Sequence, residues 1–184
     1  MNNQMFDYIF RTLGYLAAGR LKSPKDQIGK AFLNPDGEKF VVFKQTVLVP
    51  AGSPASKPQA MFRVQFRVPK IQPWRDRLII ALKSPIFVAQ PGFRSKLWMV
   101  DESNHTYQGV YEWETVKAAE EYIHSASMAF MTEVAVPGGI SYEVIPGGTI
   151  VQKGSSLLIE RVSQANQSPL RSLKTQPERA LVIG

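Results

Sequence analysis

The chain has 184 residues, of which 44% are hydrophobic, so it is long enough to bury a substantial core as a soluble globular protein. It contains no cysteine, which excludes a disulfide framework, a thiolate nucleophile, an iron–sulfur cluster and a cysteine zinc site. No stretch approaches the roughly 20 apolar residues of a membrane span, and we expect a cytoplasmic protein.

The net charge of +7 is unevenly distributed along the chain. Residues 1–60 hold 8 Lys and Arg against 4 Asp and Glu, residues 61–152 hold 9 against 9, and residues 153–184 hold 5 against 2. The excess positive charge on the flanks can attract nucleic acid or anionic lipid, or it can keep the protein soluble. We favour solubility, and we expect no nucleic-acid partner because aromatic and basic residues occupy different segments.

Residues 1–58 are interpreted as an N-terminal extension. Apolar residues at helical spacing in the first twenty positions predict an amphipathic helix, Asn34 to Gly37 form a turn signal, and 39–49 reads as a strand. The Pro- and Ser-rich stretch 50–58 then predicts a linker. Basic residues near the helix also allow peripheral attachment to an anionic membrane surface: Arg11, Arg20, Lys22 and Lys25.

Residues 59–150 predict an α+β module. Strict alternation of apolar and polar residues from 61 to 68 is typical of a half-buried strand. The remaining expected elements are a helix over 74–88, strands over 93–100 and 107–113, a long helix over 114–131 and a strand over 140–145. This β-α-β-β-α-β order is the ferredoxin-like arrangement. Residues 151–184 are expected to add a short edge strand at 156–162 and a flexible, basic tail.

Several short motifs in the central module carry a family resemblance. They are the segment 90–98 with its Pro-Gly-Phe turn, the pair Asn104-His105, the strand 109–113, and the helix with Ala118, Ala119 and Tyr122. Over residues 61–150 the chain resembles the YdhR-type monooxygenases of the dimeric α+β barrel superfamily. The resemblance implies a homodimer in which two sheets pack together, and oxidation of aromatic substrates without a bound cofactor.

The alternation of the strands assigns side chains to the two faces of the sheet. Phe62, Leu97 and Tyr111 belong to the set that would face the helices. The opposite face would meet the partner sheet, with these side chains: Arg63, Gln65, Arg67, Arg94, Lys96, Trp98, Gln108, Glu112 and Glu143. That polar face can form ion pairs across a dimer interface or a wet concavity for an acidic or phenolic ligand, and we favour the interface.

Three side chains are candidates for supplying catalytic charge to a phenolate: His105, Lys96 and Arg63. His105 also fits a solvated hairpin residue. Aromatic side chains are candidates for binding a flat substrate: Trp98, Tyr107, Tyr111, Trp113 and Tyr142. They equally fit an ordinary core.

The sequence lacks the glycine-rich, phosphate-cradling and nucleophile-elbow motifs of Rossmann dehydrogenases, P-loop NTPases and α/β-hydrolases. The two histidines, His105 and His124, lie in different elements, and we predict no metal. The leading interpretation is a cofactor-independent, monooxygenase-like homodimer that acts on or binds a small aromatic molecule. The alternative is a non-catalytic ligand-binding or assembly module, membrane-peripheral through its N-terminal helix.

Overall fold

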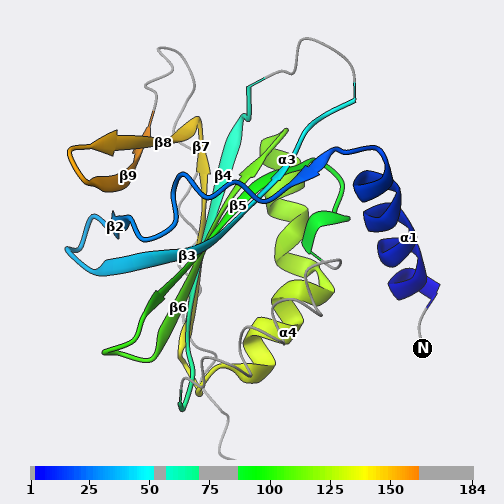
Figure 1. Cartoon of the computed structure of the whole chain (residues 1–184). Helices are drawn as coiled ribbons and strands as arrows, with labels where there is room; N and C mark the ends of the chain where they lie inside the picture. Colours follow the sequence, from blue (N-terminus) through cyan, green and yellow to red (C-terminus); the bar gives the residue numbers. More distant parts are fainter. Residues whose placement is uncertain (1–2, 52–56, 71–86, 162–184) are drawn as a thin grey trace, which may run out of the picture.

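The centre of the molecule is a four-stranded antiparallel sheet. The computed structural model describes residues 3–51, 57–70 and 87–161 (Figure 1). The central strands are ordered β7-β4-β6-β5, with these bounds: β4 Ala60–Arg67, β5 Phe93–Asp101, β6 Thr106–Trp113 and β7 Ile140–Pro146. This order confirms the ferredoxin-like arrangement. Most of the helix predicted over 74–88 lies outside the described residues. Its last two residues, Phe87 and Val88, are described and are helical.

The helical segment after β6 is interrupted, whereas the sequence predicted one long helix. It consists of α3 (Val116–Glu121), the 3-10 turn η1 (Tyr122–His124) and α4 (Ala126–Val134). Ser125 has an extended backbone, and its hydroxyl accepts a hydrogen bond from the backbone N–H of Met128 at 3.3 Å. A serine that caps a new helix start competes with continuation of the old helix, which explains the break. α3 and α4 lie on one side of the sheet (Figure 1).

The N- and C-terminal segments extend the central sheet. β3 (Lys39–Leu48) pairs with β5, β1 (Leu21–Lys22) pairs with β3, and the sheet continues through β2 (Ala31–Leu33). β9 (Ser156–Arg161) pairs in parallel with β2, and β8 (Gly148–Lys153) follows it. The predicted strand at 156–162 is therefore confirmed, but not at the edge, because the unpredicted β8 flanks it.

These added strands bury the sheet face opposite the helices. A second core forms there from apolar residues of both the central and the added strands: Phe32, Phe40, Val42, Met61, Leu97, Met99, Val110, Ile145 and Leu157. In Figure 1, β2, β8 and β9 lie on the side of the sheet away from α3 and α4. Residues of this core are almost fully buried by the chain itself. A homodimer through the sheet face stays a prediction.

A polar network ties the β2–β3 turn to the central strands. The side-chain amide of Asn34 donates to Oε1 of Gln108 at 2.9 Å, and the amide of Gln65 donates to the same oxygen at 3.0 Å. The amide of Gln65 also donates to the Glu38 carboxylate at 2.8 Å. Asn34 and Gln108 are buried, so these bonds offset the loss of hydration of both amides.

The predicted amphipathic helix is α1 (Asn3–Ala17), and much of its apolar stripe is exposed. Phe10, Leu13 and Leu16 are each more than half exposed, whereas Tyr15 packs against the core on the helix side of the sheet. Among the described residues, no helix is long and apolar enough to cross a membrane. Attachment of α1 to a membrane surface stays a prediction.

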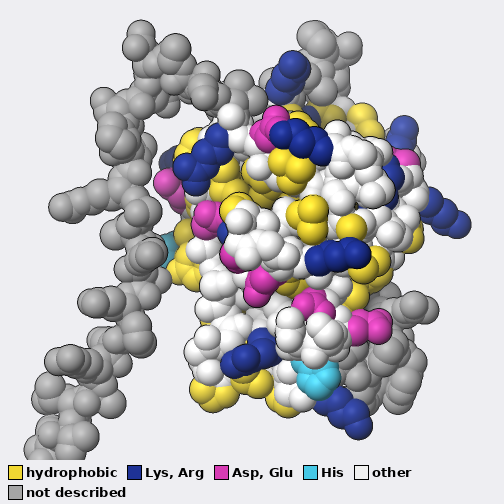
Figure 2. Space-filling model, turned by 90° about the vertical axis from the view of Figure 1, so that its left-hand side faces the viewer, with side chains coloured by type: hydrophobic (Ala, Val, Ile, Leu, Met, Phe, Trp, Pro, Cys, Tyr) yellow, Lys and Arg dark blue, Asp and Glu magenta, His cyan; other side chains and the backbone are white. Residues whose placement is uncertain are grey.

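Charges of both signs alternate over the side of the molecule seen in Figure 2, where Lys and Arg side chains are interspersed with Asp and Glu. The ion pair between Lys153 and Glu160, at 2.6 Å, belongs to the β8–β9 hairpin. A surface of mixed sign favours solubility over attraction of a polyanion.

Substitution Leu157→Ala tests whether the added strands are integral to the fold. Leu157 is 1% exposed in the second core, so we expect a loss of about 2–5 kcal/mol in the free energy of unfolding. The control Leu33→Ala removes the same atoms from a side chain that is 39% exposed, and its effect should be much smaller. Urea denaturation measures both. Equal effects would contradict the second core.

Candidate functional site

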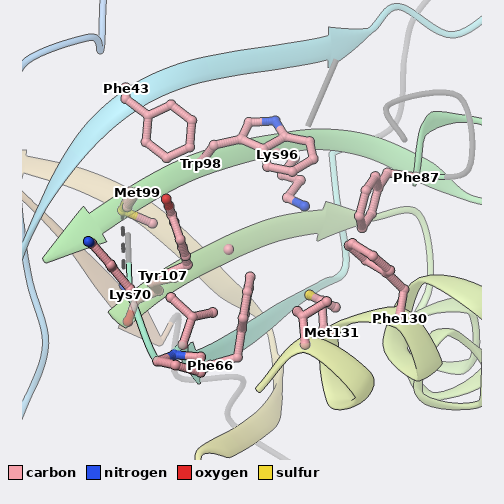
Figure 3. Close-up of a pocket in the computed structure, with 15 residues that line it drawn as sticks. Phe43, Phe66, Lys70, Phe87, Lys96, Trp98, Met99, Tyr107, Phe130 and Met131 are labelled. Atoms are coloured by element: carbon pink, nitrogen blue, oxygen red, sulfur yellow. Dashed lines mark hydrogen bonds between the residues drawn. The ribbon is translucent and has the colours of Figure 1, made fainter. Parts of the chain in front are cut away.

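A cavity of about 220 Å³ lies between the sheet and α4 (Figure 3). Aromatic side chains from six segments of the chain contribute to its wall: Phe43, Phe66, Phe87, Trp98, Tyr107 and Phe130. Met131 and Val134 of α4 add further apolar surface, while Lys70, Lys96 and Gln108 are its polar or charged lining residues in the described chain. Such a cavity, mostly apolar with few polar groups, is typical of a small-molecule site.

The aromatic walls are held by contacts between the rings themselves. Phe66 stacks on Tyr107 with ring centroids 5.6 Å apart, and Phe43 meets Tyr107 edge-on at 6.2 Å. Phe87 packs edge-on against Trp98 at 5.0 Å. These offset and edge-to-face arrangements are the favourable geometries for aromatic pairs. The cavity therefore presents rigid, flat surfaces.

The strand register brings Lys96 and Trp98 into this cavity. Lys96 lies opposite Tyr111 and Trp98 lies opposite Gly109 in the β5–β6 ladder, and partners in a ladder share a face. The prediction that Lys96 and Trp98 point away from the helices was wrong. Leu97 occupies the opposite face instead. Alternation of polar and apolar residues did not distinguish the faces because both are buried.

The Lys96 amine is surrounded by aromatic rings. Its Nζ atom lies 3.1 Å from the ring centroid of Trp98, 3.8 Å from that of Phe87 and 4.4 Å from that of Tyr111. Figure 3 shows the amine beside Phe87 and Trp98. Lys96 is only 2% exposed, and within the described parts of the chain it forms no ion pair with a carboxylate.

Burial lowers the pKa of Lys96 well below its usual value, because the ammonium loses its hydration, and the positive charge of Lys44 adds to this effect. Burial also lowers the pKa of Lys44 itself. The ring faces oppose the shift, since each stabilises a nearby cation by about 0.5–2 kcal/mol. Because no carboxylate of the described chain compensates the burial, we give burial the greater weight and expect a large neutral fraction of the amine.

Gly109 makes room for the amine. A Cβ atom at this position would lie 3.3 Å from Cε of Lys96 and 2.8 Å from Cε2 of Tyr111. Any larger residue would push both side chains out of place. The Gly-x-Tyr pattern at 109–111 was noted in the sequence for its resemblance alone, and the structure supplies this steric reason for it.

The predicted aromatic residues divide into two groups. Trp98 and Tyr107 line the cavity, and Trp98 also donates from Nε1 to the Thr46 hydroxyl at 3.3 Å. Trp113 is fully buried and stacks on Tyr111 in the core, while Tyr142 is 40% exposed and stacks on Phe62. Neither Trp113 nor Tyr142 is among the cavity's lining residues.

Tyr111 lies behind the amine rather than in the cavity wall. Its hydroxyl accepts a hydrogen bond from the Tyr122 hydroxyl at 2.8 Å, and both phenols are buried. Burial raises the pKa of Tyr111 well above its usual value and raises the pKa of Tyr122 as well. Both phenols therefore remain protonated and do not act as bases near neutral pH.

His105 is an exposed residue of the β5–β6 turn. Its backbone φ of 52° is left-handed, and its carbonyl accepts a hydrogen bond from the N–H of Val68 at 2.9 Å. The turn is organised by Asp101, whose carboxylate accepts hydrogen bonds from Ser103 and Asn104; chiefly the Ser103 hydroxyl lowers the pKa of Asp101. The structure does not bring the His105 side chain into the cavity lining.

Arg63 lies on the β4 face that points away from the helices. Its guanidinium forms an ion pair with the Glu143 carboxylate of β7 at 2.7 Å. The three predicted catalytic residues therefore occupy three different places, and only Lys96 reaches the cavity.

Sequence reasoning missed part of the cavity wall. Phe43 lies in the extension and Phe130 in α4, far from the motifs of the resemblance. Phe66 and Phe87 were read as core or helix positions. The spacing of apolar residues signals burial but not a void, so only the assembled contacts reveal these residues as cavity-lining.

No protein-family model and no curated protein matches the sequence. Three solved structures show similarity over part of the chain. A monooxygenase-like protein from Listeria innocua has 12% identity and a TM-score of 0.44, over 60% of this chain and 64% of that one. The chain thus matches less than two thirds of that protein's length.

The other two similar structures come from Listeria monocytogenes. A ferredoxin-fold protein related to antibiotic biosynthesis monooxygenases has 10% identity and a TM-score of 0.45, over 72% of this chain and 85% of that one. A heme-degrading enzyme has 10% identity and a TM-score of 0.42, over 67% and 95%. The site described above rests on this chain's own geometry.

No group of three or more His, Asp and Glu in the described residues could hold a metal ion. The charged lining residues of the cavity in the described chain are Lys70 and Lys96, so no carboxylate or imidazole is available there as a metal ligand. The described site thus offers an organic ligand an amine and aromatic rings.

Substitution Lys96→Met tests the state of the buried amine. The folded pKa is depressed, so between that pKa and the usual 10.5 the unfolded state binds more protons, and the wild-type free energy of unfolding should rise with pH. The Lys96→Met variant lacks this rise. Its free energy of unfolding minus that of wild type should therefore decrease from about pH 7 to about pH 10. Urea denaturation across this range measures the difference.

Lys117→Met is the matched control, because the Lys117 side chain is 83% exposed. Its difference from wild type should stay nearly constant with pH. A difference in the free energy of unfolding between Lys96→Met and wild type that is equally independent of pH would contradict a depressed pKa of Lys96.

Proposed function

We propose that the protein binds a small, flat phenolic or enolic molecule in the cavity and oxidises it with molecular oxygen, as a cofactor-independent monooxygenase-like protein. The observation that carries the proposal is the cavity itself, in which aromatic walls surround a buried amine that pairs with no carboxylate of the described residues. The binding half of the proposal comes from this geometry. The oxygenase half comes from the sequence resemblance.

The cavity dimensions suit a substituted aromatic ring. An apolar cavity of about 150 Å³ is large enough to hold benzene, and the volume here is about 220 Å³. The stacked pair Phe66 and Tyr107 offers a flat wall, and Phe87 and Trp98 add two rings that are nearly perpendicular to each other. Stacking against such rings favours planar, electron-rich ligands.

The amine supplies the acid–base chemistry that this oxidation requires. Neutral Lys96 accepts the proton of a phenol or enol, which creates a substrate anion beside an ammonium that the rings of Trp98 and Phe87 stabilise. The anion reacts with oxygen. For a substrate with an oxidisable CH₂ group, one oxygen atom becomes the product carbonyl, and the other leaves as water with the two hydrogens.

Water exclusion supports the same chemistry. The lining is mostly apolar, and Gln108 is engaged with Asn34 and Gln65. An anion formed in such a site interacts strongly with the Lys96 ammonium beside it because the local dielectric constant is low. The other cavity lysine, Lys70, is exposed and provides no comparable desolvated contact.

Oxygen uptake with anthrones and hydroquinones, together with binding of 2-naphthol, tests the proposal. Lys96→Met removes the base, and we expect oxygen uptake to fall by about 10²-fold or more, the usual contribution of a positioned base. Arg63→Met removes a cation of the opposite sheet face and serves as the matched control, with uptake close to wild type.

Binding alone separates the two halves of the proposal. Val134→Trp should fill the cavity and abolish 2-naphthol binding, whereas Glu133→Trp, on the exposed side of α4, should not. Binding without oxygen uptake for any substrate would refute the oxygenase half and favour a non-catalytic ligand-binding module. Failure of 2-naphthol and the anthrones to bind wild-type protein would refute both halves.

A further inference from the structure

The Lys96 amine combines three features that distinguish it from the other described lysines. It is almost fully buried, its Nζ atom lies over the Trp98 and Phe87 rings, and it lines a cavity. Among the described residues no carboxylate pairs with it. A lysine in such surroundings can act as a nucleophile, because burial favours the neutral amine and no carboxylate of the described chain holds it as an ammonium.

The charged and titratable groups around the amine favour this neutral state. Nζ of Lys44 in β3 lies 5.2 Å from the centroid of the Trp98 ring, and its positive charge acts on Lys96. The hydroxyl of Tyr122 in η1 donates a hydrogen bond to the hydroxyl of Tyr111 in β6. Both phenols stay protonated, so no described neighbour on these elements supplies a negative charge.

We propose that Lys96 forms an imine with an aromatic aldehyde or ketone that enters the cavity. The nitrogen lone pair attacks the carbonyl carbon, the C=O π electrons move to oxygen, and a proton passes from nitrogen to that oxygen to give a carbinolamine. Loss of water then leaves a C=N bond. The overall balance is amine plus carbonyl giving imine plus water, so the step needs no oxidant or reductant.

The cavity favours both the approach and the dehydration. The carbonyl carbon must reach Nζ while the ring of the ligand lies against the aromatic wall, and the amine faces the space that Phe130 and Met131 also border (Figure 3). Gly109 keeps the floor beside Lys96 open, since a Cβ atom there would lie 3.3 Å from its Cε. Mostly apolar walls disfavour return of the expelled water.

This inference rests on the proposed function for the aromatic class of the ligand, but not for its oxidation. Through the imine the site binds carbonyl compounds covalently, whereas a phenol that has no carbonyl group binds without a covalent bond. The class of ligand assigned to Lys96 is therefore aromatic aldehydes and ketones.

Reductive trapping tests the imine directly. Full-length protein is incubated near neutral pH with a limiting amount of 4-hydroxybenzaldehyde and sodium cyanoborohydride, which delivers hydride to the imine carbon and fixes it as a secondary amine. Intact mass and peptide mass spectrometry then locate the hydroxybenzyl group. We expect most of the first equivalent on Lys96.

Two variants make the result specific. Lys96→Arg replaces the amine with a guanidinium and should lose the label, whereas Lys70→Arg, which changes the exposed lysine at the same cavity, should keep it on Lys96. Wild-type protein labelled evenly over Lys70 and other exposed lysines would overturn the proposal. The wild-type peptide map decides this even if Lys96→Arg fails to fold.

The outcome is separable from the proposed function. 2-Naphthol has no carbonyl, so its binding to wild-type protein without any labelling of Lys96 would overturn the imine while leaving the aromatic site intact. Labelling of Lys96 that 2-naphthol blocks, in protein that consumes no oxygen, would support the imine and refute oxidation.

Discussion

The structure depends on the burial of two apolar faces of one sheet. α3 and α4 bury one face around Phe62, Trp113 and Tyr122. Strands contributed by both ends of the chain bury the other face around Met61, Val110 and Leu157. Since apolar burial is the dominant favourable term in folding, the extension is part of the core rather than an appendage. The result is a nine-stranded sheet whose central strands are covered by helices on one face and by the added strands on the other.

The candidate site follows from this doubly buried sheet. A charged residue on a strand buried on both faces has no solvent-facing side, so Lys96 must be accommodated inside. The register places it opposite Tyr111 and next to the gap that Gly109 leaves. Aromatic rings then surround an amine that is only 2% exposed. The cavity and its reactive group thus share one cause, the position of Lys96 in the β5–β6 ladder.

Local pattern predicted much of the fold. The alternation over 61–68 identified β4, the turn at Asn34 to Gly37 preceded β3, and the order of elements gave the ferredoxin-like arrangement. The break at Ser125 was missed because a helix-interior serine and an N-capping serine look alike in sequence. The closure by β8 and β9 was missed because it depends on pairing between residues more than 100 positions apart.

The site was only partly predictable. Lys96, Trp98 and Tyr107 were chosen for their chemistry and do line the cavity, but the sequence placed the first two on the wrong face. A polar residue usually points outward from a half-buried strand, and that rule does not apply when both faces are covered. Arg63 and His105 were chosen for their charge and acid–base chemistry. Alternation placed Arg63 on the face away from the helices and the hairpin reading placed His105 in a turn, and the structure has both there, outside the cavity lining.

The most direct test of the account is an NMR titration of protein labelled with ¹³C at lysine Cε. The signal assigned to Lys96 by its loss in Lys96→Met should titrate with a pKa well below the usual 10.5. That result would establish a neutral amine in the aromatic cavity. Titration of Lys96 together with the exposed lysines would show a solvated or compensated ammonium, and would contradict both its role as a base and its role as a nucleophile.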